Sequence, residues 1–495
     1  MTVVAACGDD GGGGGRGGTT TITFMGVNSA ETPNTQETID AINEILEDRL
    51  GINIAFQGVD QAAYNITLTG LTGIDLIASA DYLSYFDNVN QGAYQPIPRE
   101  KIRELMPTWY ADNADLLVAT LVGGQIYAIP NPSVAINMPI AMLRADWFPP
   151  GMTEVRNLDD MYEYLSYIQE TQPGLMMPWV MCEGTVAWIN GAFAFGATHL
   201  KAPGGPNCTS PAIFDKRDDP HYVMKPNWAQ PTLIPFFEYM KKFADAGFWT
   251  HDVLNNPTDM NTAFREGLSG VGWSLNVRAV QSAYELMQQL DPNARIYAYD
   301  FGYADNVSVD NFSPMGGAVS IPLNGQNMDD VLRFIELLYV TPELDHLFRY
   351  GIEGVNYELN SAGGIIRNAT HDFGLGYWVP VLNDDHEFPP AAGFWPGWEE
   401  LLAERDRRFQ LNPFAGFGFD TSSIADIMGN MWDIHMIYGM PLYLGFVDDV
   451  NEALAEINRQ LDMVGYKTYE DELFRQLQIF FDEVGFSEMG YTISR

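Results

Sequence analysis

Thr21-Ile22-Thr23-Phe24-Met25 opens the part of the chain that sets the architecture, because its polar and apolar residues alternate as they do in a β-strand. Asn34 and Glu37 then form the pattern of a capping box, which satisfies the free amides at the start of a helix. Gly51 is a stop signal for that helix. Its apolar residues share one face: Ile39, Ile42, Ile45, Leu46 and Leu50. A strand followed by an amphipathic helix indicates the first half of a βαβ unit.

Two further strands follow this helix. Ile52-Asn53-Ile54-Ala55-Phe56 alternates again, a helical stretch runs from about Asp60 to Leu71, and Ile74-Asp75-Leu76-Ile77-Ala78 reads as a short buried strand. The order strand–helix–strand–helix–strand predicts a parallel sheet with crossover helices, and ligands of such sheets bind at the carboxyl ends of the strands. We therefore expect Ser79-Ala80-Asp81-Tyr82, which follows the third strand, to lie beside a ligand.

The length and charge of the chain restrict its organisation and its partners. At 495 residues it exceeds the ~250–300 residues at which a single core stops growing, so two large lobes are expected. Its 65 acidic and 26 basic residues give a formal net charge of −39, which repels phosphate backbones and argues against a nucleic-acid partner. The acidic residues are spread along the chain, which indicates a highly solvated surface. The apolar runs are shorter than the ~18 residues that span a bilayer.

The N-terminus resembles the lipobox of bacterial lipoproteins. Val4-Ala5-Ala6-Cys7 is a run of small residues that ends in cysteine, and a glycine-rich tether then extends to Gly18. The resemblance implies that Cys7 carries lipid and anchors the protein to the extracellular face of the cell membrane. Met1 to Ala6 is shorter than a full signal, which has a basic region and about 7–15 apolar residues, so an ordinary cysteine is the alternative.

The remaining cysteines and the acidic motifs point to no bound metal. Cys182 and Cys208 could form a disulfide outside the cytoplasm, and two buried thiols are the alternative. Asp384-Asp385-His386-Glu387 could ligate a metal, but we expect a solvated loop there. We expect neither a metal nor a cofactor.

The later part of the chain alternates helices and strands and ends mainly in helices. Asn157 and Asp160 form a cap for one helix, and Met328 to Tyr350 predicts two packed helices broken at Pro342. The region from Pro173 to Pro235 is rich in Trp, Pro and Gly, which predicts long loops with short helices. Three helices are expected from Ser422 onward.

Several segments in order carry a likeness to a known family. The most specific is Tyr350-Gly351-Ile352-Glu353-Gly354-Val355-Asn356-Tyr357. The others are Gly73-Ile74-Asp75-Leu76-Ile77, Asn90-Gln91-Gly92-Ala93-Tyr94-Gln95-Pro96, 124–130, 264–273, 314–322, 328–339, Gly416-Phe417-Gly418-Phe419-Asp420, 445–448 and 476–478. Together they resemble the extracellular solute-binding proteins of bacterial ABC importers (family 1), and within them the larger LipO-type lipoproteins.

The resemblance implies a two-lobe α/β fold of the periplasmic-binding-protein type (type II), with parallel-rich sheets flanked by helices and a helical C-terminal extension. The lobes would close on a solute held in the cleft between them. Residues 1–18 would form the lipobox remnant and tether. The first lobe would contain residues 19–131 and 312–350, and the second residues 132–311 and 351–495.

A sugar site needs aromatic faces that stack on sugar rings and planar polar groups that pair with hydroxyls. Trp273 ends a strand and is similar in position to the ligand tryptophan of the family. Asp81 and Tyr82 follow a buried strand at its carboxyl end, and Asn28 follows the first strand. For each of these the alternative is a purely structural side chain.

The expected hinge and the second lobe supply four more candidates. Asn131 lies at the first crossover between the lobes, where it could reach the ligand or merely shape the hinge. Tyr357 follows a turn near the expected lobe junction, with a core tyrosine as the alternative. Glu183 and Trp188 lie where the second lobe should face the cleft, and a structural role is again the alternative.

These observations favour a binding protein over an enzyme. The sequence has no G-x-S-x-G, H-E-x-x-H or P-loop motif. We expect a monomeric solute-binding lipoprotein of an ABC importer, which captures a solute, an oligosaccharide by preference, and delivers it to a membrane permease. The alternatives are a secreted carbohydrate-active enzyme, whose aromatic content would be the same, and the ligand-sensing subunit of a signalling system, which would have the same fold.

Overall fold

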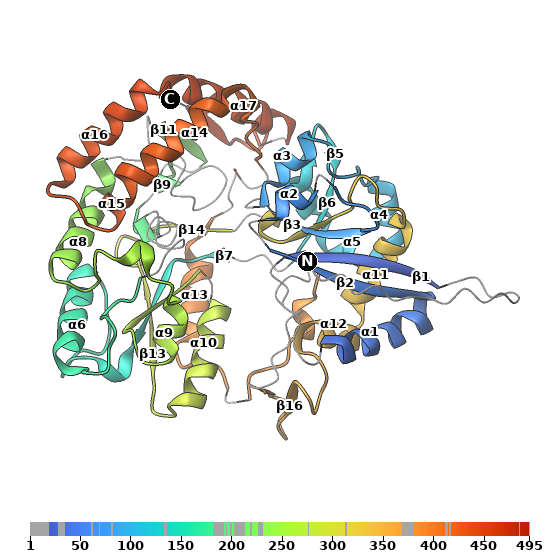
Figure 1. Ribbon diagram of the computed structural model, residues 1–495, viewed down its shortest axis with the longest axis horizontal. Coiled ribbons are helices and arrows are strands. Elements are labelled where there is room, and N and C mark those ends of the chain that lie inside the picture. The colour runs from blue at the N-terminus through green and yellow to red at the C-terminus, as the bar shows by residue number, and fades with distance from the viewer. Residues whose placement is uncertain are drawn as a thin grey trace, which may run out of the picture.

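The computed structural model consists of two lobes joined by chain segments that cross between them (Figure 1). Two of these segments lead from β6 to β7 and from β14 to β15, and a third stretch of chain runs from Leu382 in the first lobe to Trp395 in the second. The structure describes residues 19–27, 35–60, 63–68, 70–80, 83–132, 136–181, 193–194, 196–198, 200–201, 213–217, 220–225, 231–275, 277–311, 314–368, 381–391, 393–410, 414, 417–484 and 486–494.

The first lobe is built on a five-stranded sheet. Its strand order is β2 (Ile52–Val59), β1 (Thr20–Val27), β3 (Leu76–Ser79), β15 (Ala318–Ser320) and β6 (Ala128–Pro130). β1 is parallel to both β2 and β3, as the sequence predicts, whereas β15 is antiparallel to both of its neighbours. The chain therefore returns from the second lobe to add a strand to the middle of the first sheet.

Helix α1 (Thr35–Leu50) follows the amphipathic pattern of its sequence. Ile42 and Leu46 are fully buried, and the helix packs against β2 and ends before Gly51, whose φ of 69° permits the left-handed turn. α2 (Tyr64–Leu68) is shorter than the helix predicted over residues 60–71. The other helices of this lobe are α3 (Tyr85–Asn90), α4 (Arg99–Leu105), α5 (Pro107–Asn113), α11 (Met328–Val340) and α12 (Pro342–Tyr350), the last two separated at Pro342 as predicted.

The second lobe contains a three-stranded antiparallel sheet. β8 (Ile140–Arg144) lies between β12 (Val271–Ser274) and β13 (Ile296–Asp300) and is antiparallel to both. The parallel pairing expected from the sequence is therefore absent from this sheet. The helices of this lobe are α6 (Leu158–Thr171), α8 (Ile234–Asp245), α9 (Met260–Arg265), α10 (Val277–Leu290) and α13 (Trp398–Arg408).

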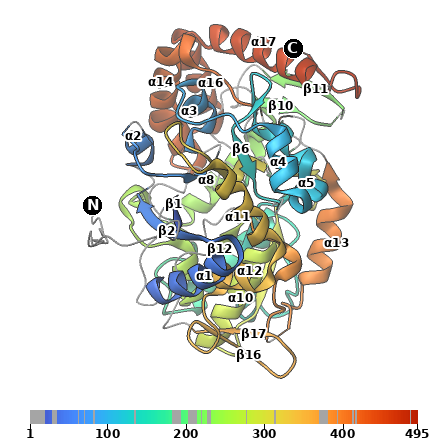
Figure 2. The same cartoon turned by 90° about the vertical axis from the view of Figure 1, so that its right-hand side faces the viewer.

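The C-terminal helices pack on the core of the second lobe and form an arch at the top of Figures 1 and 2. They are α14 (Ala425–Ile434), a π-helical turn (His435–Gly439), α15 (Met440–Tyr443), α16 (Val450–Met463) and α17 (Tyr466–Glu483). The helical extension predicted from the sequence is therefore present. In Figure 1, α17 extends from the second lobe toward α3 of the first.

Short strands complete the fold. β19 (Thr492–Ser494), β11 (His221–Lys225), β10 (Ile213–Asp215) and β9 (Leu200–Lys201) form a sheet within a region predicted as loops, and it includes the end of the chain. The remaining strands are β4 (Leu121–Val122), β5 (Gln125–Ile126), β7 (Ile136–Asn137), β14 (Val309–Asn311), β16 (Tyr357–Leu359), β17 (Ile365–Arg367) and β18 (Phe409–Gln410).

The described side chains form separate cores. One core lies in the five-stranded sheet and its helices, and it also includes Val381 and Leu382. A larger core and a smaller one lie in the second lobe, and the β16–β17 hairpin has its own small cluster. The lobe boundaries drawn from the sequence stay a prediction. Among the described residues, no helix is both long and apolar enough to cross a membrane.

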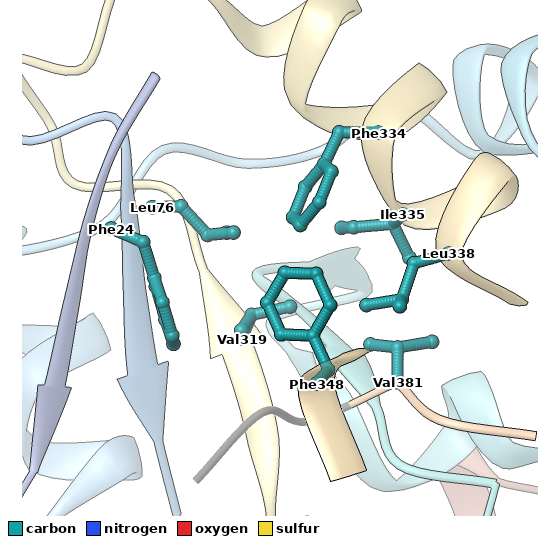
Figure 3. Close-up of a pocket in the computed structure, with 8 residues that line it drawn as sticks. All are labelled: Phe24, Leu76, Val319, Phe334, Ile335, Leu338, Phe348 and Val381. Atoms are coloured by element: carbon teal, nitrogen blue, oxygen red, sulfur yellow. The ribbon is translucent and has the colours of Figure 1, made fainter. Parts of the chain in front are cut away.

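A small cavity lies inside the first core, between the sheet and helices α11 and α12 (Figure 3). It encloses about 10 Å³, which is room for one water molecule at most. Its lining is entirely apolar: Phe24, Leu76, Val319, Phe334, Ile335, Leu338, Phe348 and Val381. This cavity is a packing defect of the core and is too small for a sugar.

Candidate functional site

The carboxyl ends of the first-lobe strands meet at one edge of the sheet. β1 ends at Val27 and β3 at Ser79, and Ala318 of β15 pairs with both Ser79 and Pro130, the last residue of β6. The two crossing segments therefore join the first lobe at the same edge where a ligand of a parallel sheet would bind. Asn28, Asp81 and Tyr82 follow these strand ends in sequence, but they lie outside the described residues.

The second lobe presents an equivalent edge. Ile140, the first residue of β8, pairs with Ser274 and with Asp300, which are the last residues of β12 and β13. The amide of Met138 donates a hydrogen bond to the carbonyl of Leu275 at 2.9 Å, which holds this edge next to the first crossing segment.

The two crossing segments are hydrogen-bonded to each other. β7 pairs antiparallel with β14, with Asn137 opposite Asp310. Farther toward the first lobe, the amide of Asn131 donates to the carbonyl of Gly317 at 2.9 Å. In Figure 1, β7 and β14 lie between the two lobes. The edges of the two sheets are thus tied to one ribbon of crossing chain, which is the geometry of a hinge.

Trp273 lies one residue before the second-lobe edge. Its side chain is partly exposed and packs against the core of that lobe, and its amide donates to Asn261 Oδ1 at 2.8 Å. A Cβ atom on the preceding Gly272 would lie 2.9 Å from the ring of Phe264, so glycine is what lets α9 pack closely on β12. The structure thus places Trp273 at the edge where the sequence predicts it.

Asn131 is half-buried at the start of the first crossing segment, also as predicted. Tyr357 lies elsewhere: it is 5% exposed in the cluster of the β16–β17 hairpin, with ring centroids 5.7 Å from Tyr350 and 5.8 Å from Phe388. Burial raises the pKa of Tyr357 to about 12. The structure therefore brings Asn131 and Trp273 to the crossing segments but places Tyr357 among core aromatics.

Other predicted residues lie outside the described part of the chain. These are the candidate ligand residues Glu183 and Trp188 and the cysteines Cys7, Cys182 and Cys208. Their roles stay predictions.

The acidic motif at residues 384–387 is solvated, as the sequence predicts, because Asp385 and Glu387 are exposed and none of the four residues is buried. What the sequence does not predict is that Asp384 and Glu387 form ion pairs with Arg278 and Arg349. Sequence reasoning missed these two arginines because each is far away along the chain. Within the described residues, no group of three or more His, Cys, Asp or Glu side chains is arranged to hold a metal ion.

Asn261 is a second residue that sequence reasoning missed, and its side chain orders the backbone of Trp273. It lies in the first turn of α9, where Asp259 accepts a hydrogen bond from the amide of Thr262 at 2.8 Å. The capping pattern of Asp259 could have located this helix from the sequence, but the contact of Asn261 with β12 could not have been found in that way.

Comparisons with known proteins give the fold. No curated protein matches the sequence. A family model described as a domain of unknown function (DUF3502) matches residues 413–482 and assigns no activity. The N-glycan transport solute-binding protein NgtS from Streptococcus pneumoniae is 18% identical, with a TM-score of 0.74 over 94% of this chain and 99% of that one. The chain has the fold of an ABC-transporter solute-binding protein.

Two further solved structures support the same fold. A solute-binding protein from Bifidobacterium longum infantis, described as binding HMO, is 15% identical, with a TM-score of 0.61 over 94% of this chain and 99% of that one. An EF-hand mutant of the substrate-binding protein FusA of S. pneumoniae, in complex with fructo-nystose, is 13% identical, with a TM-score of 0.60 over 94% of this chain and 100% of that one. These neighbours are binding proteins of transporters and not enzymes.

Proposed function

We propose that this protein is the solute-binding component of an ABC importer and that it binds an oligosaccharide between its two lobes. The observation that carries the proposal is the likeness to NgtS, which spans 94% of the chain and includes a structure solved in complex with Man1GlcNAc. The pairing of β7 with β14 between the lobes also supports the proposal, because a binding protein of this kind needs a hinge about which two surfaces can close on a solute.

The proposed ligand surface is formed by the two facing sheet edges. Trp273 would offer a flat aromatic face to a sugar ring, and Asn131 would offer an amide to the hydroxyls. Asn28, Asp81, Tyr82, Glu183 and Trp188 remain proposed contributors. We leave Tyr357 out of this surface because it is buried in its own cluster.

Charge narrows the proposed substrate class to neutral sugars. A net charge of −39 repels polyanions, so uronate polymers should bind poorly. The alginate-binding protein AlgQ2 shares the fold with a TM-score of 0.66 and 15% identity over 93% of this chain and 98% of that one, so the fold alone does not make this choice. The net charge of the chain favours the neutral class.

The cellular setting is part of the proposal. Cys7 would carry the lipid that anchors the protein to the extracellular face of the membrane, and a permease would receive the solute. The LipO-type relationship and the monomeric state are proposed with it. Mass spectrometry of the protein isolated from membranes would test the anchor directly, since a diacylglyceryl group adds a defined mass to the N-terminal cysteine.

A thermal-shift screen tests the binding function. A ligand that binds only the folded state raises the melting temperature by mass action, with a gain of about 2.7 kcal/mol at a concentration of 100 Kd. We expect one class of neutral oligosaccharide to stabilise the protein and dipeptides and polyols to leave it unchanged. Turnover of a glycoside by the purified protein, lost on substitution of a carboxylate pair, would instead establish an enzyme.

A further inference from the structure

Two arginines from different lobes contact the same carboxylates. Arg278, in the first turn of α10 in the second lobe, lies 2.9 Å from Glu387 Oε1 and 3.0 Å from Asp384 Oδ1. Arg349, at the end of α12 in the first lobe, lies 3.0 Å from the same oxygen of Glu387 and 3.6 Å from that of Asp384. The segment that carries these two carboxylates is thus held between the lobes.

The segment is anchored to the first lobe. Asp345 of α12 is fully buried and accepts hydrogen bonds from Arg349 Nε at 2.6 Å and from the amide of Asn383 at 2.8 Å. A further contact joins His346 Nε2 to the carbonyl of His386 at 2.7 Å. α12 itself belongs to the first core, where Phe348 is fully buried.

Arg278 belongs to the second lobe. Val277 and Val280 of the same helix are buried in its smaller core, and α10 packs against α9 and β12. The ion pair between Arg278 and Glu387 therefore lies away from β7 and β14, on the stretch of chain that runs from Leu382 in the first core to Trp395 in the second lobe. In Figure 1, α10 and α12 lie on one side of β7 and β14, and α3 and α17 lie on the other.

The exposure of the network decreases from its second-lobe side to its first-lobe side. The exposed fraction of the side chain falls from 48% at Arg278 to 34% at Glu387 and 12% at Arg349. Burial raises the pKa of Glu387 although two arginines lie beside it. The Arg278–Glu387 pair is about as exposed as the surface pair Arg333–Asp330, so it should weaken in high salt, whereas Arg349 is better shielded from solvent.

We propose that Arg278 acts as an interlobe latch, which holds the lobes at the observed angle by binding the Asp384–Glu387 segment of the first lobe. The latch would regulate the proposed solute site, because the angle between the lobes sets how much of the protein is ready to bind. Only this effect on affinity rests on the proposed function. The effect on the lobe angle does not.

The test measures the distance between the lobes without any ligand. Fluorophores placed through unnatural amino acids at Glu47 of α1 and Glu170 of α6, both exposed, report on the two lobes in the full chain. The variant is Arg278→Gln. The matched control is Arg333→Gln, because Arg333 is also 48% exposed and forms a 3.0 Å ion pair with Asp330, but within one lobe.

We expect Arg278→Gln to lengthen and broaden the distance distribution, and Arg333→Gln to leave it as in the wild type. Glu387→Gln should change the distribution in the same direction, and the double variant should change it by less than the sum of the two, because both substitutions remove the Arg278–Glu387 contact. High salt should broaden the wild-type distribution and affect Arg278→Gln less. The salt comparison needs no substitution, so it holds even if a variant folds poorly.

Identical distributions for Arg278→Gln and Arg333→Gln, with no salt response in the wild type, would overturn the latch. A lengthened distance in a protein that binds no sugar would retain the latch and refute the proposed function. If both the latch and the proposed function are correct, oligosaccharide affinity should fall several-fold in Arg278→Gln and remain unchanged in Arg333→Gln.

Discussion

Phe86 on α3 of the first lobe lies directly against Gly418, which precedes the C-terminal helices of the second lobe. A Cβ atom added to Gly418 would lie 2.1 Å from Phe86 Cδ1 and 2.7 Å from its Cβ. Rotation of the ring cannot relieve the second contact, because Cβ is fixed to the backbone. The lobes therefore meet here as well, on the other side of the crossing segments from the Arg278 network (Figure 1).

Substitution of Gly418 should disturb this contact. Gly418→Ala is expected to cost about 1–3 kcal/mol of stability, as overpacking does, or to move the lobes apart. Gly429→Ala is the control, since an added Cβ there meets no atom within 4 Å. Urea unfolding and the interlobe distance measure the two effects. A Gly418→Ala protein that matches Gly429→Ala in both would show that the lobes do not press together at this point.

Phe348 is a key residue of the first core. It lines the cavity in Figure 3, and its ring lies 5.9 Å from that of Phe334 and 6.0 Å from that of Phe56. Phe348→Ala should lower the free energy of unfolding by about 3–5 kcal/mol, because it enlarges a cavity that cannot collapse. Phe394 is 52% exposed, so Phe394→Ala should lower the free energy of unfolding far less. Equal losses in chemical denaturation would contradict this account of the core.

His435 predicts a pH dependence of stability. It is 2% exposed in the π-helical turn, and burial lowers its pKa to about 4. A histidine in the unfolded chain has a pKa of about 6.5, so the stabilising contribution is complete above that pH and is lost as the pH falls from about 6.5 to about 4. The loss should reach about 3 kcal/mol.

Urea unfolding between pH 4 and pH 8 measures this contribution. His435→Gln should flatten the curve between pH 4 and pH 6.5, whereas His251→Gln, at an exposed position, should retain the slope of the wild type. If His435→Gln keeps the full slope, other groups are responsible for it.

Trp273 is the most direct probe of the proposed sugar surface. Trp273→Ala is expected to abolish ligand binding, or to weaken it at least about 30-fold, the loss of about 2 kcal/mol typical of a central aromatic contact. The fold should persist, because the side chain is only partly buried. Trp398→Ala removes another partly buried tryptophan of the same lobe and should bind sugar normally. Unchanged sugar affinity in Trp273→Ala would show that the sugar site lies elsewhere in the protein.

Local patterns in the sequence predicted much of the fold. β1 follows the alternation of residues 21–25, and α1 follows the apolar face that includes Ile42 and Leu46. The side chain of Asn157 accepts a hydrogen bond from the amide of Asp160 at 2.9 Å and caps α6, as its pattern predicts. Such signals depend on neighbours along the chain, and a single sequence contains them in full.

Contacts between distant residues were not predicted. The pairing of β19 with β11 joins Thr492 to His221, and no local pattern specifies such a partner. The same is true of Arg278 and Glu387, whose meeting depends on how two lobes are placed. For the candidate site, the positions of Asn131 and Trp273 at strand ends could be predicted, whereas the packing of Tyr357 among aromatics was decided by a hairpin that the sequence did not reveal.

Isothermal titration of the full chain with a neutral N-glycan fragment, a fructo-oligosaccharide and an alginate oligosaccharide tests the central claim most directly. The account predicts saturable binding at one site per chain for a neutral sugar and none for alginate, with binding to that sugar lost in Trp273→Ala. Heat from alginate alone would contradict the assignment to neutral sugars. A flat titration with every sugar, in a protein shown to be folded, would contradict the proposed function itself.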